Sequence, residues 1–423
     1  MSELKYKDEG WNNIFNKLNI LQEIHLKNKF LISAKQIKDL SGKEPRRLCK
    51  NDTIKSLPKL FQEEKLSILP IKNGQYIIYK DPEFKSFARL SNFSNIKLDK
   101  YKVQSHSKLI TLNKEKLTSE SKAIDYASNY GLLNHYCNDR LVPTIRGREY
   151  SEEFDFLLDK NTGTINVKSV QIEVDSGFEG DDTILLIEGK NSTRASFNIR
   201  QLYYPFRHYD IRTKQMKKIK NVLLCYSNGI YYLTELVFGK NYYDYTINPT
   251  SAFVIEEPSA KKINLSELLL QPIFSPNTDI PIPQADDLNK IVDLVLMLNT
   301  KTSMNKHDVA DSFEFDERQG DYYSNAGRYL GFIKKENQNY TLTNLGKKLS
   351  TNKSRKERSE ILISQILKID LFNEIMSTLI KNDLKIDRNL IIKCLEKKGL
   401  IGSTAARRSS TIKSWINWGK NEL

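Results

Sequence analysis

Residues 171–190 read QIEVDSGFEGDDTILLIEGK, and this stretch decides how the middle of the chain is expected to fold. An apolar alternation ends at Asp175, a polar turn follows, and a second apolar run from Thr183 to Ile187 ends in Glu188-Gly-Lys190. The spacing predicts two adjacent strands, with Glu188 and Lys190 on the same face because strand side chains alternate with a period of two. Two carboxylates and an amine at adjacent strand ends can hold Mg²⁺ beside a phosphodiester and orient a water for attack.

The length, composition and charge of the chain indicate how many domains it has and what kind of partner it binds. With 423 residues it is too long for one ordinary hydrophobic core, so two to four domains are expected. Its 39% hydrophobic and 10% aromatic content suits globular folding and argues against wholesale disorder. The formal net charge of +14 favours a polyanionic partner, although a lysine-rich genome bias would give the same excess.

Cysteine spacing and hydropathy indicate the compartment. The four cysteines are widely separated without any C-x-x-C spacing, which argues against a zinc site or a disulfide framework and fits a reducing environment. No apolar run approaches 18 residues, and the N-terminus lacks the pattern of a signal peptide. We therefore expect a cytoplasmic protein with no membrane-spanning segment.

Hydrophobic periodicity divides the chain into four expected domains. Residues 1–115 are expected to form an N-terminal α/β DNA-binding domain, and residues 116–275 follow an αβββαβ order. A proline-rich interval at 272–283 marks the next boundary. Residues 286–350 predict a winged helix-turn-helix domain with three helices and a two-stranded wing, and residues 351–423 a helical, second helix-turn-helix-like element. The expected fold class is α/β and α+β, multidomain, with a mixed central sheet and a mainly helical C-terminal part.

The residues around the opening stretch predict further elements. A helix is expected over Glu120–Tyr136, a second from about Ala195 to His208, and then a hairpin of strands Asn221–Tyr226 and Ile230–Val237. The aromatic side chains on the second helix are expected to pack in the core rather than stack on bases; they are Tyr203, Tyr204 and Phe206.

Several segments together resemble a known nuclease superfamily. The stretch resembles the PD-(D/E)xK nuclease signature, with Val174 where that signature has proline, and the wider chain is similar to type II restriction endonucleases of that superfamily. The resemblance covers roughly residues 120–423 and, more weakly, Arg46–Pro70. Its segments are Glu173-Val-Asp175, Ile187-Glu-Gly-Lys-Asn191, Phe197–Arg207, Asp316–Gly331 and Thr404–Trp415.

The resemblance implies a central PD-(D/E)xK core and a role for each candidate residue. Asp175 and Glu188 would hold one or two Mg²⁺ ions, and Lys190 would hydrogen-bond the attacking water or a phosphate oxygen. Glu173 shares a strand face with Asp175 and is either an extra ligand or a solvated strand carboxylate. Arg200-Gln201, on the following helix, could touch the phosphate or the water shell of the metal. Glu173, Gln201 or an upstream glutamate could complete that shell.

Basic and amide side chains supply candidate DNA contacts. On the helix expected over residues 316–330, Arg suits guanine, Gln or Asn suits adenine, and Tyr or Arg suits phosphate. Residues 351–423 carry a net charge of about +7, which favours phosphate contact. Helices of this kind also serve protein contacts, and a solvated surface explains the N-terminal basic loop equally well. The candidates are Arg46, Arg47, Lys50, Arg200, Arg318, Gln319, Tyr322, Asn325, Arg328, Arg407, Arg408 and Lys413.

The resemblance implies a type II restriction endonuclease that needs Mg²⁺ and cleaves double-stranded DNA at a specific sequence, leaving 5′-phosphate and 3′-hydroxyl ends. A homodimer on DNA is expected because cutting both strands takes two such cores. A cognate DNA methyltransferase, as a separate protein, is implied as well. Two alternatives stay open: a structure-specific repair or junction nuclease, and a DNA-binding regulator whose nuclease fold is inactive.

Overall fold

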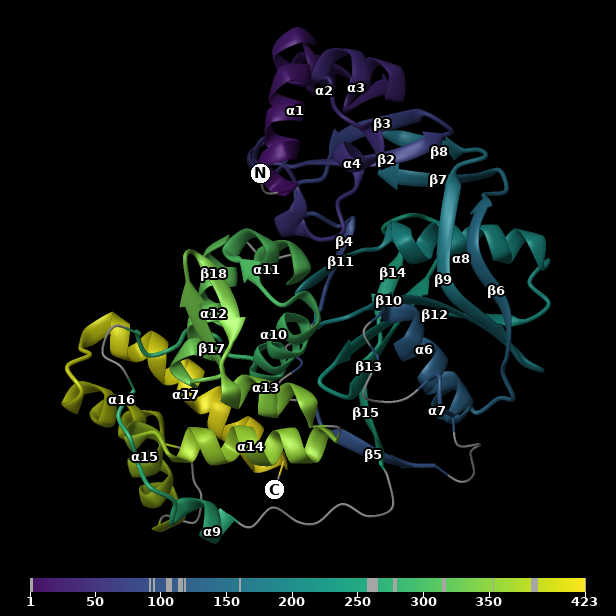
Figure 1. Ribbon diagram of the computed structural model, residues 1–423. Coiled ribbons are helices and arrows are strands. Elements are labelled where there is room, and N and C mark those ends of the chain that lie inside the picture. Colours follow the sequence, from purple (N-terminus) through teal and green to yellow (C-terminus); the bar gives the residue numbers. More distant parts are fainter. Residues whose placement is uncertain are drawn as a thin grey trace. The chain divides into compact units, whose positions relative to one another are not determined.

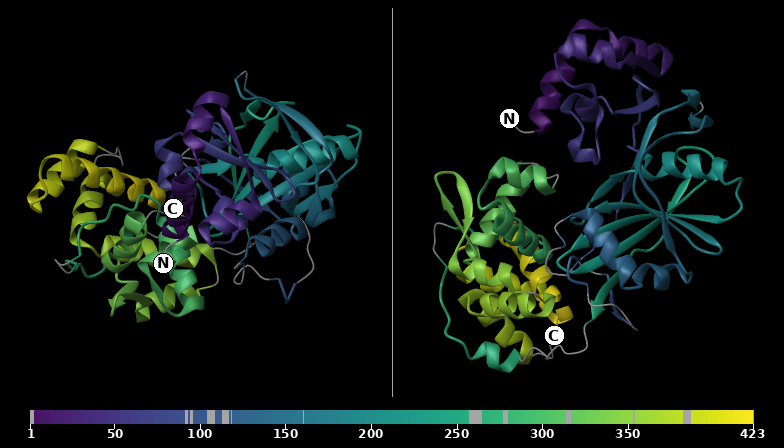
Figure 2. Two further views of the ribbon diagram at one scale, coloured as in Figure 1. Left: turned by 90° about the horizontal axis from the view of Figure 1, so that it is seen from above. Right: turned by 45° about the vertical axis from the view of Figure 1, so that its right-hand side comes forward.

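The chain folds into two compact units (Figure 1). Unit 1 comprises Met1–Lys108, Leu117–Tyr226 and Tyr231–Val254, and unit 2 comprises the remaining segments, chiefly Ile255–Leu423. The computed structural model describes residues 3–90, 93, 96–103, 109–112, 117, 119–159, 161–256, 265–276, 280–313, 317–352, 354–381 and 387–422. The expected boundary at residues 115/116 and the expected helix start at Asp316 lie outside these ranges. Two further views show each unit from other sides (Figure 2).

The N-terminal part of unit 1 is an antiparallel sheet in the order β1-β3-β2, covered by short helices. Trp11, Phe61 and Ile78 are fully buried in its core. Strands β2 and β3 are consecutive in the chain and pair directly with each other. The elements are α1 (Glu3–Lys17), α2 (Ile20–Lys27), β1 (Lys29–Ser33), α3 (Ala34–Ser41), α4 (Pro45–Cys49), the 3-10 helix η1 (Ile54–Ser56), α5 (Lys59–Glu63), β2 (Leu66–Lys72), β3 (Gln75–Lys80) and β4 (Phe87–Arg89).

The central part of unit 1 is a mixed sheet in the order β5-β15-β13-β12-β10-β9-β6. Strand β10 is parallel to β12 and antiparallel to β9. The expected mixed sheet and the hairpin β12–β13 are confirmed. The elements are β5 (Leu98–Lys102), α6 (Glu120–Asn129), α7 (Leu132–Cys137), β6 (Val142–Tyr150), β7 (Phe154–Asp159), β8 (Gly163–Val167), β9 (Gln171–Glu179), β10 (Thr183–Lys190), β11 (Ser196–Asn198), α8 (Arg200–Arg212), β12 (Lys218–Ser227), β13 (Ile230–Phe238), β14 (Tyr245–Ile247) and β15 (Ser251–Glu256).

Helices α6 and α8 pack against opposite sides of β10. On one side, Ile184 and Leu186 share a hydrophobic cluster with Tyr209 of α8. On the other side, a Cβ at Gly189 would lie 3.1 Å from Cδ1 of Ile124 in α6. Because neighbouring strand residues point to opposite faces, the even and odd residues of β10 meet different helices. The glycine allows α6 to approach the end of the strand.

Two expected helices differ from the observed ones. The helix predicted over 120–136 is divided into α6 and α7, because Gly131 adopts φ +79°, a left-handed conformation that interrupts a helix. The helix predicted from Ala195 begins at Arg200, because residues 196–198 form β11 and pair with β4. The aromatic prediction is confirmed for Tyr203 and Tyr204, which are fully buried.

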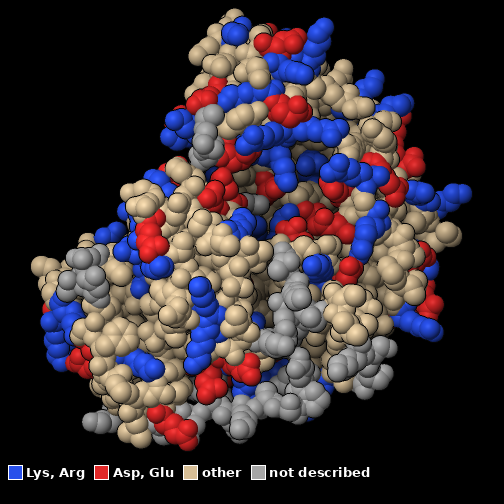
Figure 3. Space-filling view, in the orientation of Figure 1, with Lys and Arg blue, Asp and Glu red and all other residues tan. Residues whose placement is uncertain are grey.

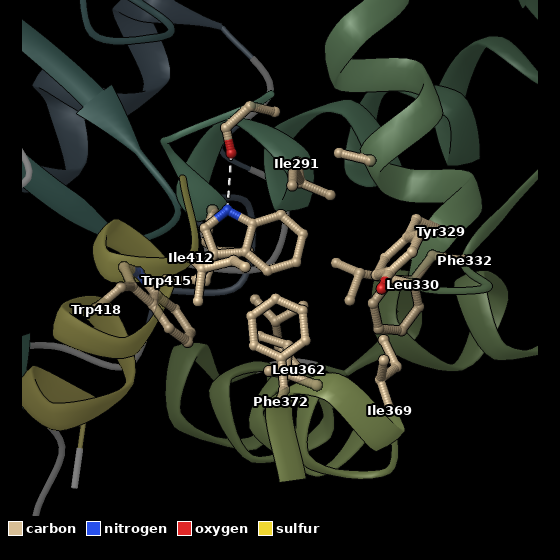
Figure 4. Packing of buried hydrophobic residues seen from close by; sticks show 14 of the residues in the cluster. Ile291, Tyr329, Leu330, Phe332, Leu362, Ile369, Phe372, Ile412, Trp415 and Trp418 are labelled. Carbon is tan, nitrogen blue, oxygen red and sulfur yellow. Dashed lines mark hydrogen bonds between the residues drawn. The ribbon is translucent and has the colours of Figure 1, made fainter. Parts of the chain in front are cut away.

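The helices of unit 2 surround one hydrophobic cluster (Figure 4). Trp415 stacks on Phe372 with ring centroids 5.4 Å apart, and its Nε1 donates to Ala285 O at 2.7 Å. The cluster runs from Leu268 to Trp418, so residues on both sides of position 350 share it. The C-terminal part is mainly helical, as expected, and it shares one core with residues 268–350.

The expected order of three helices followed by a hairpin is present as α10, α11, α12, β17 and β18. Among the described residues, every helix is too short or too polar to cross a membrane. The elements are α9 (Leu265–Leu269), α10 (Leu288–Lys301), β16 (Met304–Asn305), α11 (Lys306–Phe313), α12 (Glu317–Tyr329), β17 (Ile333–Glu336), β18 (Asn339–Leu342), α13 (Asn344–Thr351), α14 (Arg355–Leu367), α15 (Asp370–Lys381), α16 (Arg388–Lys397) and α17 (Gly402–Glu422).

Candidate active site

An irregularity in the pairing of β9 with β6 sets the direction of Asp175. The register shifts there, so Asp175 and Ser176 of β9 both stand opposite the single residue Arg146 of β6. An extra residue of this kind bends a strand and redirects its side chains. Asp175 Oδ2 accepts a hydrogen bond from the backbone N of Gly189 at 2.8 Å. This bond connects the carboxylate of β9 to the end of β10.

Glu188 and Lys190 lie two residues apart at the end of β10 and are largely buried. Their side chains are 9% and 10% exposed, and Lys190 Nζ donates to Glu188 Oε1 at 2.7 Å. Gln201 Nε2, from the first turn of α8, donates to the same oxygen at 2.6 Å. Four of the candidate residues, Asp175, Glu188, Lys190 and Gln201, therefore meet beside the end of β10. Asp175 lies in the middle of β9 and not at the strand end that the sequence predicts, because β9 continues to Glu179.

The two members of the buried pair differ in how their charge responds to pH. Burial raises the pKa of Glu188 to about 7; Lys190 opposes this rise and the charge of Asp175 adds to it. Burial lowers the pKa of Lys190, but the charges of Glu188 and then Asp52 outweigh burial, so the pKa of this amine lies above its usual value. Lys190 therefore keeps its proton, and Glu188 is the member of the pair whose charge changes near neutral pH.

Helix α6 brings another carboxylate, Glu120, to the site. A Cβ at Gly189 would lie 3.1 Å from the Cβ of Glu120 and 3.6 Å from Asp175 Oδ2. Burial raises the pKa of Glu120, Lys190 lowers it and Asp175 raises it. Glu120 is thus an upstream glutamate of the kind expected to complete a metal shell. Its position after the helix-capping Ser119 is the only sequence signal for it, and many surface helices start in the same way.

The oxygen atoms at this site fit a hard divalent cation. Carboxylates and carboxamide oxygens are ligands that Mg²⁺ accepts. Gln201 Oε1 is buried, and among the described residues it has no hydrogen-bond partner, which is uncommon for a buried polar atom and leaves it available to a ligand or a water. Within the described ranges no group of three or more His, Cys, Asp or Glu side chains is arranged as a metal cluster. Mg²⁺ commonly takes one or two carboxylates and completes its shell with waters and phosphate oxygens, so Asp175 and Glu188 satisfy its needs.

Glu173 and Arg200, the other candidates near this site, have different partners. Glu173 is exposed, and one of its carboxylate oxygens lies 3.3 Å from Nε of Arg148 on β6. The Arg200 guanidinium lies 5.9 Å from the centre of the Tyr204 ring, one turn further along α8. Glu173 therefore forms a surface ion pair, and Arg200 is held against its own helix.

The N-terminal basic candidates are partly engaged within unit 1. Arg47 Nε donates to Glu3 Oε2 at 2.7 Å. Lys50 Nζ lies 3.4 Å from a carboxylate oxygen of Asp52. Arg46, on α4, is exposed. All three side chains are exposed, and Arg47 and Lys50 each have an acidic neighbour.

The candidate DNA contacts on α12 pair largely with their own helix. Arg318 Nε donates to the Tyr322 hydroxyl at 2.5 Å, and Arg328 Nη1 donates to Asn325 Oδ1 at 2.8 Å. Asn325 Nδ2 in turn donates to a carboxylate of the same helix at 3.0 Å. Gln319 is half-buried. These side chains are therefore oriented by local hydrogen bonds before any partner arrives.

Helix α17 contributes basic residues to the same surface of unit 2. Burial lowers the pKa of Arg408, which also interacts electrostatically with Tyr322 of α12 and with Arg407. Arg388 of α16 donates to a backbone carbonyl of α17 at 3.2 Å, and Lys413 is exposed. Arg408 of α17 and Tyr322 of α12, one candidate from each helix, therefore lie near enough to interact electrostatically. Basic and acidic side chains are interspersed on the face seen in Figure 3, so net charge alone does not mark a binding face.

Three family models match the chain. Residues 8–78 match a Domain of unknown function (DUF6996), residues 82–253 a Domain of unknown function (DUF6997), and residues 290–421 a Domain of unknown function (DUF7226). No curated protein and no solved structure matched. Asp175, Glu188 and Lys190 fall within the match at 82–253, whose description assigns no activity.

Proposed function

We propose that the protein is a Mg²⁺-dependent endonuclease of the PD-(D/E)xK type, and that it acts on double-stranded DNA as a type II restriction enzyme. The observation that supports this proposal most is the meeting of Asp175 of β9 with Glu188 and Lys190 at the end of β10, beside a buried amide oxygen of Gln201 without a partner among the described residues. A mixed sheet with α6 and α8 on its two sides supports the same type of core. The products would carry 5′-phosphate and 3′-hydroxyl ends.

Each residue of the site has a distinct part in the proposed reaction. Bound Mg²⁺ would lower the pKa of a water and neutralise charge on the scissile phosphate. Asp175 and Glu188 would hold the ion, and Glu120 and Gln201 offer further oxygens. Lys190, which keeps its proton, donates hydrogen bonds to a phosphate oxygen or to the attacking water. A preorganised ammonium in a buried site stabilises developing negative charge more strongly than it would in water.

Unit 2 is proposed to bind the DNA through a winged helix-turn-helix arrangement. The helices α10–α12 and the hairpin β17–β18 have the order of such a domain. The surface that includes Arg318, Tyr322, Arg407 and Arg408 offers guanidinium and hydroxyl groups of the kind used for phosphate contact. A homodimer on DNA, a cytoplasmic location and a separate methyltransferase belong to the same proposal.

A cleavage assay tests the proposed function. Plasmid and phage DNA are incubated with the whole protein in Mg²⁺ or in EDTA, beside Lys190→Ala and the control Lys218→Ala. Lys218 is exposed at the start of the neighbouring strand β12. Loss of one charge-stabilising donor is expected to slow cleavage by a factor of about 10² to 10³. Circular dichroism establishes that each variant is folded.

The outcomes separate three functions. Discrete, Mg²⁺-dependent bands that Lys190→Ala loses and Lys218→Ala retains support a restriction endonuclease. Preference for branched DNA, or an unspecific smear, identifies a structure-specific nuclease instead. DNA that is shifted in a gel but left uncut by the unaltered protein identifies a regulator without nuclease activity.

A further inference from the structure

Asn198 connects the helix beside the candidate active site to the N-terminal part of unit 1. It is the last residue of β11 and is 6% exposed. Its Nδ2 donates to Asn51 O at 2.7 Å, and its backbone N donates to Asp52 O at 2.9 Å. Its Oδ1 accepts a hydrogen bond from the backbone N of Arg200 at 3.1 Å. One buried residue thus binds both the segment before η1 and the first residue of α8.

A buried ammonium fixes the segment before η1 from its other side. Lys7 of α1 is 4% exposed, and its Nζ donates to Asn51 Oδ1 and to Ser56 O, each at 3.2 Å, and also to the carbonyl of Lys50. A lysine ammonium has three donors, so these acceptors satisfy it. Residues 50–56 are therefore held by α1 on one side and by β11 on the other.

The first turn of α8 carries the amide that meets the active-site carboxylate. Gln201 directly follows Arg200, and its Nε2 donates to Glu188 Oε1 at 2.6 Å. The residue before this turn is bound as well, since the backbone N of Ile199 donates to Ser86 O at 3.0 Å. Groups of an active site keep their geometry only when the residues behind them are fixed by packing and hydrogen bonds. The place of the Gln201 amide therefore depends on how the start of α8 is held.

We infer that Asn198 is a positioning residue: by tying the first turn of α8 to the N-terminal part, it holds the Gln201 amide on Glu188. The catalytic part of this inference rests on the proposed function. A shift of this turn would move both the hydrogen bond to the proposed metal ligand and the buried Gln201 oxygen, which has no partner among the described residues. The region matched at 8–78 would then complete the active site of the region matched at 82–253, in addition to any role in DNA binding.

Hydrogen exchange of the whole chain, measured by mass spectrometry, tests the tie without DNA or metal. Asn198→Asp keeps an acceptor for the backbone N of Arg200 but sets a carboxylate oxygen against the carbonyl of Asn51, so it breaks the tie and leaves the helix start capped. Asn198→Ser is the milder variant, because it removes the donor and adds no charge. The control is Asn129→Asp, since Asn129 is exposed on α6 and its Nδ2 also donates to a backbone carbonyl, Asp125 O, at 2.8 Å.

Both Asn198 variants are expected to raise the exchange rates of peptides from residues 50–56 and 196–203. The rise should be about 10-fold, the effect of one lost buried hydrogen bond on local opening. The control should leave both peptides unchanged. A rise confined to 196–203 would show that Asn198 only caps α8 and would overturn the inference, as would the absence of any rise.

The positioning role is tested by Mg²⁺ titration of plasmid cleavage. Both Asn198 variants are expected to raise the Mg²⁺ concentration for half-maximal cleavage by about 10-fold, as changes behind a metal ligand commonly do. A smaller folded fraction lowers kcat but leaves this concentration unchanged, so the titration separates positioning from stability. An unchanged Mg²⁺ requirement beside raised exchange would overturn the positioning role. If the unaltered protein cleaves no DNA, the proposed function and the positioning role both fail, whereas hydrogen exchange still decides whether Asn198 joins the two regions.

Discussion

Glu188 in unit 1 and Asp293 in unit 2 are both buried carboxyl groups, and burial raises the pKa of each to about 7. Their neighbours differ. Both oxygens of Asp293 are occupied, since Ser227 Oγ donates to Oδ2 at 2.5 Å and the backbone N of Asn228 donates to Oδ1 at 2.9 Å. For Glu188, the hydrogen bonds from described residues both end on Oε1, and Asp175 carries a like charge nearby. A raised pKa therefore shows isolation from water, and the surrounding groups decide whether a carboxyl group is structural or chemical.

The largest expected difference between the two carboxyl groups lies in DNA cleavage. Glu188→Gln removes a proposed metal ligand and should slow cleavage by a factor of about 10² to 10³, as loss of one electrostatic group in an active site commonly does. Asp293→Asn should leave the rate unchanged. Initial rates of plasmid linearisation in saturating Mg²⁺ measure both. Equal losses in the two variants would remove the distinction drawn between them.

The second expected effect is the pH dependence of stability. Because the pKa of Asp293 rises from about 3.9 in the unfolded chain to about 7 in the fold, the folded state binds more protons between these values. Its contribution to stability is therefore present at low pH and is lost as pH rises from about 4 to about 7. The loss is about 4 kcal/mol at most. Asp293→Asn should flatten this slope in unfolding measurements from pH 4 to 8, and an unchanged slope would contradict the assignment.

The smallest expected effect concerns the closeness of α6 to the active-site strand. Gly189→Ala places a Cβ 3.1 Å from both Glu120 and Ile124, so the helix must shift. Such overpacking lowers the free energy of unfolding by about 1 to 3 kcal/mol. Displacement of Glu120 should also raise the Mg²⁺ concentration needed for half-maximal cleavage. Thermal unfolding and Mg²⁺ titration measure the two effects. In unit 2, Gly419→Ala of helix α17 is the matched control, because a Cβ there meets nothing within 4 Å. An equal loss of stability in both variants would contradict the expected clash between residue 189 and α6.

The sequence predicted those features of the site that depend on neighbours along one strand. Glu188 and Lys190 share a strand end because they are two residues apart, and Gln201 follows on the next helix. The redirection of Asp175 depends on a shift in pairing with Arg146, and no local pattern marks such a shift.

In the fold as well, local patterns could be predicted from the sequence and long-range pairing could not. Alternation and helical periodicity predicted the mixed sheet, the hairpin β12–β13 and the helical C-terminal part, because each is a local pattern. The division of helices at Gly131 depends on one left-handed residue, and β11 depends on a partner strand, β4, far away in the chain. On α12, the helix was expected, but hydrogen bonds such as that from Arg318 to Tyr322 depend on side-chain conformations that the sequence does not specify.

Strand β5 limits how far the protein can fold while it is being synthesised on the ribosome. It pairs with β15, which follows roughly 150 residues later in the chain. Until Ser251–Glu256 has been synthesised, β5 lacks this neighbour and β13 has an open edge, which is a ready template for wrong pairing with other chains. Unit 1 therefore cannot finish folding during the first half of translation, and a nascent chain that stalls before residue 251 is a candidate for chaperone binding or aggregation.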